Sequence, residues 1–441
     1  MTDMPPPPPP YVPPAVTAPA PLVQPSPSAK GPSRKRPVMI VAAVAIALVG
    51  VGGVYVATKS DSSSSTAASA ARSLPATAES QWSTDFDGYG SAQSDGTTVY
   101  VTETDQSDVS VSALDARSGD ERWNQRLSSA TYAYVGVITT RGVVVRSSDD
   151  NSVSLALLDA KDGSEVWTLN PRDAGLIENS GLTYLATSSG GGEGGGGSFT
   201  ELQLIDLATG KKGKRATADR SLTFSGNRVI AFNDKNVEIL QASSLEMVGD
   251  AIKIDRDTTS VAVLDGRLIA AVGDRISAIA ADGTELWVDD SPVNQVYGLH
   301  VQNGKLFISG DKGVAAVAIG GDGLEELWNA DGYFYGGAAG SRLVAVDANK
   351  GELAMLDEST GVEACTIDGE FQSESGPWQV FDNGVLVSSY DSNSSRLTTE
   401  AFSLPSGDSM WAIDDAYITV GKGWLVGVES NGDNFTVSFY R

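Results

Sequence analysis

Residues 113–123 read ALDARSGDERW, and this stretch decides the fold. An apolar strand runs into an Asp/Ser/Gly turn, and a second strand then ends on a large side chain, Trp123. The phrase returns as LLDAKDGSEVW (157–167), LIDLATGKKGK (204–214), MLDESTGVEAC (355–365) and FSLPSGDSMW (402–411), and in shortened form as IAADGTELW (279–287) and GGDGLEELW (320–328). A recurring strand–turn–strand phrase is typical of repeat proteins built from small β-sheets.

Each repeat also contains an apolar strand segment ahead of the phrase. These segments start at residues 97, 142, 181, 228, 267, 305, 342, 384 and 423, which are 37 to 47 residues apart. Four-stranded blades that repeat about every 40 residues, and that bury both faces only against their neighbours, form β-propellers. The pattern predicts an all-β fold, a β-propeller of four-stranded blades over residues 81–441. Eight blades are expected, and a direct count of the units gives nine as the alternative.

The two ends of the repeat region complement each other. The last unit, from about residue 416 to residue 441, has three strand segments and lacks the one that carries Trp. The first segment, QWSTDF at 81–86, contains Trp82 and has the character of that missing strand. It is therefore predicted to complete the last blade and to tie down both ends of the domain.

Three segments precede the propeller. Residues 1–37 are rich in proline, with an unbroken proline run at 5–10, and predict a disordered tail that a proline-recognising partner could bind. Residues 38–57 carry no charge, and at about 1.5 Å per residue they are long enough for a transmembrane helix. Residues 58–80 are predicted to form a flexible Ser/Ala linker.

The basic residues near the predicted helix set its orientation. Lys30, Arg34, Lys35 and Arg36 lie just before residue 38. Because positively charged flanks stay on the cytoplasmic side, we expect a single-pass cell-membrane protein with its N-terminus in the cytoplasm and its propeller outside.

The charge of the chain disfavours nucleic acid as a partner. The formal net charge is −25, from 31 basic and 56 acidic residues. Five of the basic residues and one of the acidic ones lie before residue 60, which leaves 26 basic and 55 acidic residues and a net charge of −29 for the rest. Such a surface repels phosphate backbones and attracts cations or basic protein surfaces.

The phrase Ala-x-Asp-x-x-[Ser/Thr]-Gly-x-x-x-Trp resembles the repeat of the pyrroloquinoline quinone (PQQ)-like β-propeller family, over about residues 81–441. That family includes quinoprotein alcohol dehydrogenases and the propeller lipoprotein of the bacterial outer-membrane assembly machine. The resemblance implies the propeller fold, and a shared fold leaves the activity open. A quinone-dependent dehydrogenase and an envelope-biogenesis assembly factor are therefore both kept as alternatives.

The repeated aromatic and turn residues are interpreted as structural rather than as a ligand cage, because they recur at the same place in successive units. They are Trp82, Trp123, Trp167, Trp287, Trp328, Trp411, Gly119, Gly163, Gly210, Gly361 and Gly407. Cys365 stands where other units carry Trp, and it is predicted to be a packing thiol rather than a nucleophile.

No catalytic, cofactor-binding or metal-ligating residue is predicted. Quinone enzymes of the family carry a pair of adjacent cysteines near the cofactor, and Cys365 is the single cysteine here. His300 is the single histidine, so a site with several histidines is excluded, and its sequence context predicts a strand residue.

The expected function is therefore a non-catalytic scaffold or sensor at the cell envelope, which binds a protein or glycan partner. Binding residues usually lie on loops that a rigid scaffold holds. The longest departures from the repeat period are residues 190–198 and 370–378, so the candidate partner-binding residues are Gly190, Ser198, Glu370 and Trp378.

Overall fold

The computed structural model describes residues 73–441, apart from 106–107, 128–129, 150–151, 172–174, 180, 189–198, 226, 256, 340, 348, 368–377, 392–395 and 405. The predicted tail (1–37), the predicted transmembrane helix (38–57) and most of the predicted linker lie outside these residues, as do Gly190, Ser198 and Glu370. No helix with the length and hydropathy needed to cross a bilayer occurs in the described part of the chain.

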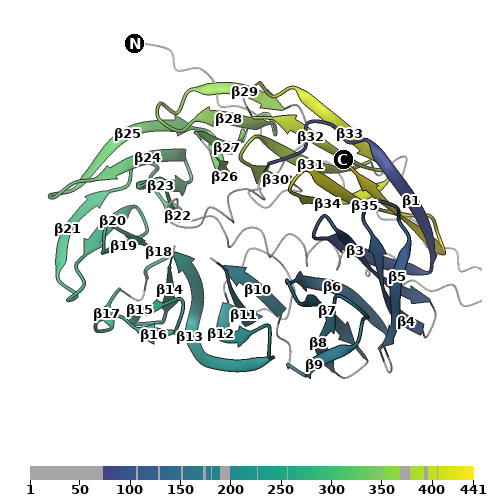
Figure 1. The fold of residues 1–441 in the computed structure, drawn as a ribbon. Helices are drawn as coiled ribbons and strands as arrows, with labels where there is room; N and C mark the ends of the chain where they lie inside the picture. The colour runs from purple at the N-terminus through teal and green to yellow at the C-terminus, as the bar shows by residue number, and fades with distance from the viewer. Residues whose placement is uncertain are drawn as a thin grey trace, which may run out of the picture. The chain divides into compact units, whose positions relative to one another are not determined.

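The regular structure of the described residues consists of strands, which confirms the prediction of an all-β fold. Most strands form four-stranded antiparallel sheets in which chain order is also spatial order (Figure 1). The first two such sheets are β2 to β5 (Tyr89–Ser94, Thr98–Asp105, Asp108–Asp115, Glu121–Leu127) and β6 to β9 (Tyr132–Ile138, Gly142–Ser148, Val153–Asp159, Glu165–Leu169).

Four more sheets of this kind follow later in the chain. They are β18 to β21 (Ser260–Leu264, Arg267–Val272, Arg275–Ile279, Glu285–Asp290), β22 to β25 (Val296–Gln302, Lys305–Gly310, Gly313–Ile319, Leu324–Asp331), β26 to β29 (Tyr333–Ala339, Arg342–Asp347, Leu353–Asp357, Glu363–Ile367) and β30 to β33 (Trp378–Phe381, Gly384–Asp391, Arg396–Ser403, Ser409–Asp414).

One eight-stranded sheet contains two successive repeat units. Its strands are β10 (Gly175–Asn179), β11 (Leu182–Ser188), β12 (Phe199–Asp206), β13 (Lys211–Ser225), β14 (Arg228–Phe232), β15 (Asn236–Gln241), β16 (Glu246–Met247) and β17 (Ile252–Lys253). The first half of β13 pairs with β12 and its second half pairs with β14, so this one long strand belongs to both units. The irregular fourth unit ends in two short strands, β16 and β17, which both pair with β15.

The closing strand lies where the sequence predicts it. β1 (Ser80–Asp87) pairs antiparallel with β36 (Asn434–Tyr440), and β35 (Trp424–Ser430) and β34 (Ala416–Gly421) complete that sheet. The prediction that the N-terminal strand completes the last sheet is confirmed. Strands from opposite ends of the domain thus share one set of ladder hydrogen bonds.

Apolar side chains join each unit to the next. Nine core clusters in the described residues each combine residues of two successive units. In the cluster that joins the last unit to the first, Phe435 and Phe439 of β36 pack with Ala92 of β2 and Val99 of β3. The sheets therefore follow one another around a common centre, as in a β-propeller (Figure 1).

Candidate functional site

The repeated tryptophans form the same contact at successive unit boundaries, which we call the Trp–turn contact. The indole N–H donates to a backbone carbonyl in the Asp/Gly turn of the following unit. These pairs are Trp82 to Ala116 (3.0 Å), Trp123 to Ala160 (3.0 Å), Trp167 to Leu207 (2.8 Å) and Trp328 to Glu358 (2.9 Å). A shared hydrogen bond that joins neighbouring units in this way is a structural role.

The turn glycines lie under these indole rings. Gly119, Gly163, Gly210 and Gly361 have φ between +67° and +77°, and a Cβ atom on any of them would lie 2.5–3.0 Å from the indole of the preceding unit. The turn Asp holds the loop, since its carboxylate accepts an N–H two residues later, as Asp115 does from Arg117 (2.8 Å). The spacing from Asp to Gly in the phrase therefore fixes both the turn and the surface on which the ring rests.

The last Trp of the repeat takes its acceptor from the other end of the chain. The indole of Trp411 donates to the carbonyl of Pro75 (2.9 Å), and the side-chain amide of Asn383 binds the N–H and the carbonyl of Leu74 (2.7 and 2.9 Å). Leu74 is 3% exposed. Packing thus begins at Leu74 and not at the predicted boundary of residue 81, because this short segment replaces a turn that the last unit lacks.

Besides the irregular fourth unit, which ends without a Trp, three boundaries depart from the pattern. Cys365 occupies the Trp position, where its thiol lies 3.8 Å from the carbonyl of Leu404 and burial raises its pKa. Lys214 occupies that position in the third unit and forms an ion pair with Glu246 (2.8 Å). Trp287 is buried, but its indole N–H has no hydrogen-bond acceptor among the described residues, since the following turn is shortened to residues 320–323.

Trp378 is the one predicted partner-binding residue that the structure describes. It opens β30, its indole N–H donates to the carbonyl of Gly336 (3.3 Å), and it packs against a core cluster together with Val380. Its side chain therefore contacts the neighbouring unit.

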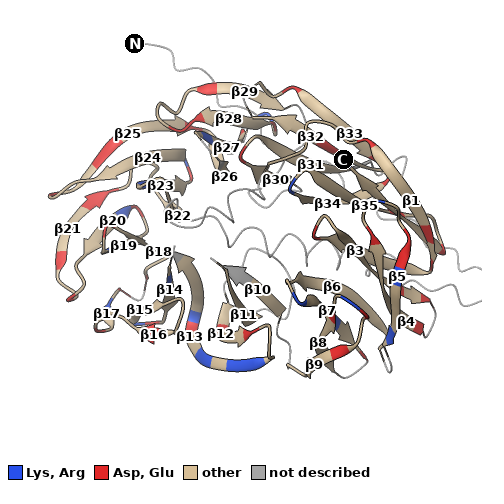
Figure 2. Ribbon diagram, in the orientation of Figure 1, with Lys and Arg blue, Asp and Glu red and all other residues tan. Residues whose placement is uncertain are grey.

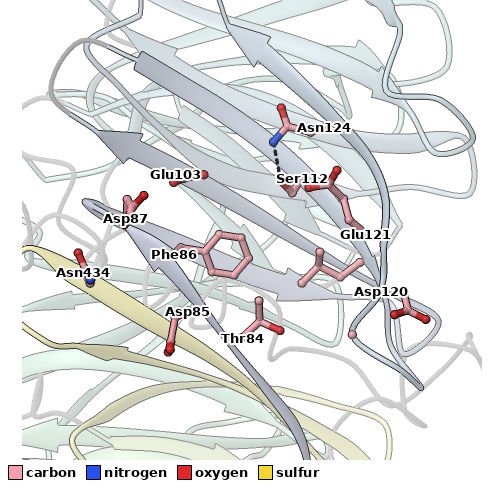
Figure 3. Close-up of a pocket in the computed structure, with 12 residues that line it drawn as sticks. Thr84, Asp85, Phe86, Asp87, Glu103, Ser112, Asp120, Glu121, Asn124 and Asn434 are labelled. Atoms are coloured by element: carbon pink, nitrogen blue, oxygen red, sulfur yellow. Dashed lines mark hydrogen bonds between the residues drawn. The ribbon is translucent and has the colours of Figure 1, made fainter.

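A cleft of about 540 Å³ lies beside the closing strand, between β1 and β36 on one side and the sheet of β2 to β5 on the other. We call it the closing-seam cleft (Figure 3). Its lining includes five carboxylates and no Lys or Arg: Asp85, Asp87, Glu103, Asp120 and Glu121. The half-buried ring of Phe86 stacks on Phe435, with centroids 5.2 Å apart, and faces the cleft between these acidic groups.

The acidic groups of the cleft differ in environment. Burial raises the pKa of Glu103, and the nearby carboxylates of Asp87 and Asp105 raise it further, against the hydrogen bonds that Glu103 accepts. Asp87 and Glu121 are exposed at the rim, whereas Asp85 accepts a hydrogen bond from Thr436 (2.7 Å). The cleft thus presents an aromatic face and a field of negative charge, which suit a cationic side chain.

The candidate residues predicted from the sequence do not include those of the cleft. The closing strand ends in TDFD at 84–87, where acidic residues alternate with Phe86, and this alternation on an edge strand was the available signal. No group of three or more His, Cys, Asp or Glu side chains within the described ranges is arranged to hold a metal ion.

His300 lies on β22, as the sequence predicts, and stacks on Tyr335 of the next unit with ring centroids 4.0 Å apart. Burial lowers its pKa from 6.5 to about 4. The unfolded chain therefore binds a proton between pH 6.5 and 4 that the folded chain does not, so this group's stabilising contribution is complete above pH 6.5 and is lost toward pH 4.

We expect the free energy of unfolding to fall by about 3 kcal/mol through His300 when the pH is lowered from 6.5 to 4. A pKa shift of one unit corresponds to about 1.4 kcal/mol. Urea unfolding of the wild type and of His300→Gln at several pH values measures this. The difference between the two chains isolates the histidine from the many carboxylates. Parallel pH profiles for the two would contradict the prediction.

The comparisons with known proteins agree with the repeat. Residues 63–212 match the family model described as "Outer membrane protein assembly factor BamB". No curated protein matches the chain.

Several solved structures match at low identity. BamB from Moraxella catarrhalis is 16% identical, with 82% of this chain and 97% of that chain covered and a TM-score of 0.37. The quinohemoprotein alcohol dehydrogenase ADHIIG from Pseudomonas putida HK5 is 12% identical, with 82% and 76% covered and a TM-score of 0.40. Hsv2 from Kluyveromyces lactis is 11% identical, with 60% and 91% covered and a TM-score of 0.39.

The family match covers the first units, where the Asp/Gly phrase and the Trp–turn contact are most regular. The family resemblance predicted from the phrase at residues 113–123 is confirmed over residues 63–212, which match this family model.

Proposed function

We propose that this protein is a non-catalytic binding scaffold, held at the cell membrane by the predicted helix at 38–57, whose propeller faces outward and binds a basic segment of a partner protein. The closing-seam cleft is the observation that carries the proposal. It combines five carboxylates with the face of Phe86 and has no basic side chain in its lining.

The chemistry of the cleft supports a Lys or Arg side chain as the bound group. A cation over an aromatic face gains about 0.5–1 kcal/mol at an exposed site and more when water is excluded. Carboxylates at the rim, such as Asp87 and Glu121, lie on two sides of Phe86 (Figure 3) and favour basic side chains at the cleft. The net charge of −29 after residue 60 attracts a basic segment over a longer range.

The test uses the full-length protein in an uncharged detergent and a fluorescent lysine-rich peptide. Asp87→Asn with Glu121→Gln is expected to weaken binding at least about tenfold, because both rim charges are lost. Asp274→Asn with Asp322→Asn removes the same charge from exposed positions outside the cleft and is expected to stay within about twofold. An equal loss of peptide affinity in both double variants would indicate a diffuse charge effect and would contradict the proposal.

A narrower form of this function is favoured by the family match, whose description is that of an outer-membrane assembly factor. In that form the bound partner belongs to a machine that assembles membrane proteins. Crosslinking in intact membranes, followed by identification of the captured proteins, tests it. Capture of proteins unrelated to membrane-protein assembly would argue against this narrower form and leave the scaffold proposal standing.

The quinone-dependent alternative predicts a measurable activity. As a non-catalytic scaffold, the purified protein is expected to leave an electron-accepting dye unreduced in the presence of PQQ, calcium ions and a range of alcohols and sugars. Dye reduction that requires the protein, the quinone and the substrate together would overturn the non-catalytic proposal.

We also infer that the propeller has nine blades, the direct count of the repeats, rather than eight. The support is that β13 serves two units and that nine core clusters each join two successive units. Electron-microscopy averages viewed down the central axis would show eight blades if this inference fails.

A further inference from the structure

A run of basic residues on β13 stands out against the acidic surface of the domain. Lys211, Lys212, Lys214 and Arg215 fall within five consecutive residues, and all four are exposed. Only 26 basic residues are present after residue 60, against 55 acidic ones. Figure 2 shows basic residues, in blue, gathered along the outer part of β13.

The outermost strands of most other units are more acidic, although β5 carries Arg122 and Arg126 beside Glu121. β1, β5, β9, β21, β25, β29 and β33 each carry at least one exposed carboxylate, such as Glu165 on β9 and Glu363 on β29. Charged residues at the edge of a sheet prevent unwanted pairing, and either sign of charge achieves this. Edge protection therefore does not explain why residues 211–217 carry four cations and no acid.

This half of β13 also leaves one side of its backbone available. Residues 211–217 pair with β12, whereas β14 joins β13 from Ser221 onward. No other strand pairs with residues 211–217 in the part of the chain that the structure describes. An edge of seven residues is about 23 Å long, enough for a short extended peptide. The register with β12 shifts between Gln203 and Ile205, so this edge bends at Gly213 and Lys214.

The basic side chains on this edge are accessible to a ligand. Lys211 and Lys212 are exposed, and the charge of Lys211 helps to lower the pKa of Asp206, its neighbour across the β12–β13 pair. Lys214 pairs with Glu246 (2.8 Å) and Arg215 with Glu201 (2.6 Å), with both basic side chains more than half exposed. Exposed pairs of this kind contribute about 0–1 kcal/mol, so a ligand carboxylate can replace them.

We propose that residues 211–217 of β13 are a docking edge for an extended acidic segment of a partner protein, which adds to the sheet as a further strand. Backbone hydrogen bonds along the edge supply affinity, and the side chains that alternate to the two faces supply specificity. Consecutive cations on one strand point to both faces, and so do the side chains of an added strand.

A peptide fits this edge better than an anionic membrane does. Lipid headgroups can pair with the four charges, but they offer no regular series of donors and acceptors to a strand edge. The edge also lies on the third unit and has the opposite charge to the closing-seam cleft, so it is a second site, independent of the function proposed above.

The test measures binding of a fluorescent Val-Glu-Glu-Val-Glu-Glu-Val peptide, whose acidic residues point to both faces of a strand, to the full-length protein in uncharged detergent. Lys211→Gln with Lys212→Gln is expected to weaken binding at least about tenfold at low salt. Lys161→Gln with Lys312→Gln, an equal change at two exposed lysines elsewhere, is expected to stay within about twofold. Equal binding by the two double variants would overturn the proposal.

Two further measurements separate strand addition from simple charge attraction. The same peptide with its central Val replaced by Pro keeps its charge but loses a backbone donor, and it is expected to bind at least about tenfold more weakly. Amide hydrogen exchange at residues 211–217 should slow when the unmodified peptide binds. Unchanged exchange would contradict a peptide-docking edge. So would binding of the protein to phosphatidylglycerol vesicles through Lys211 and Lys212 in the absence of any binding of the peptide.

Discussion

Deletion of β1, residues 80–87, is expected to lower the melting temperature of the propeller by about 10 °C or more, or to abolish its cooperative unfolding. The deletion removes a complete strand from the sheet of β34 to β36. It also removes Trp82, which stacks on Phe439, and Phe86, which stacks on Phe435. Loss of one buried aromatic side chain costs about 3–5 kcal/mol by itself, and each kcal/mol shifts the midpoint by a few degrees at most in a domain of this size.

The control is a deletion of similar length in the predicted linker, residues 60–67, whose Ser-rich sequence has no apolar side chain larger than Ala. Thermal unfolding followed by near-ultraviolet circular dichroism compares the two chains. Leu74 and Pro75 must stay in both, because Leu74 packs against the sheet of β30 to β33 and the two residues bind Asn383 and Trp411. Equal melting temperatures for the two deletions would mean that the closing strand does not hold the domain together.

Replacement of Trp328 by Ala is expected to lower the free energy of unfolding by about 3–5 kcal/mol, the range for a buried aromatic side chain. Trp328 is 7% exposed, packs against Phe307 with ring centroids 6.0 Å apart and donates to the carbonyl of Glu358. Its neighbour Leu327 is 42% exposed, so Leu327→Ala is expected to stay within about 1 kcal/mol. Urea unfolding of both variants measures the difference.

The hydrogen bond of the Trp–turn contact can be isolated by Trp→Phe substitutions. Trp123→Phe removes a bond to Ala160 and leaves that carbonyl without the indole donor, whereas Trp287→Phe removes a buried N–H that has no acceptor in the described structure. Trp123→Phe is therefore expected to cost about 1–2 kcal/mol more than Trp287→Phe. Equal costs would show that ring packing alone determines the contribution of these tryptophans.

The candidate site was less predictable than the fold. The prediction placed partner binding on long insertions at 190–198 and 370–378, on the general rule that loops carry binding residues. Of these residues the structure describes Trp378, which donates to Gly336 and packs against the neighbouring sheet. The closing-seam cleft joins Asp87 to Asn434, which are distant in sequence, so only the pairing of β1 with β36 brings its walls together.

The sequence by itself determined the all-β fold, the repeat and the closing strand. Their causes are local: the Asp-to-Gly spacing fixes a turn, and alternating apolar residues fix the strands on either side of it. Only the tertiary structure decided that Pro75 completes the contact of Trp411, that Trp287 has no such acceptor, and that β13 runs unbroken through two units with a basic outer edge. Each of these depends on which distant segment packs beside a residue, and no local pattern in the chain records that neighbour.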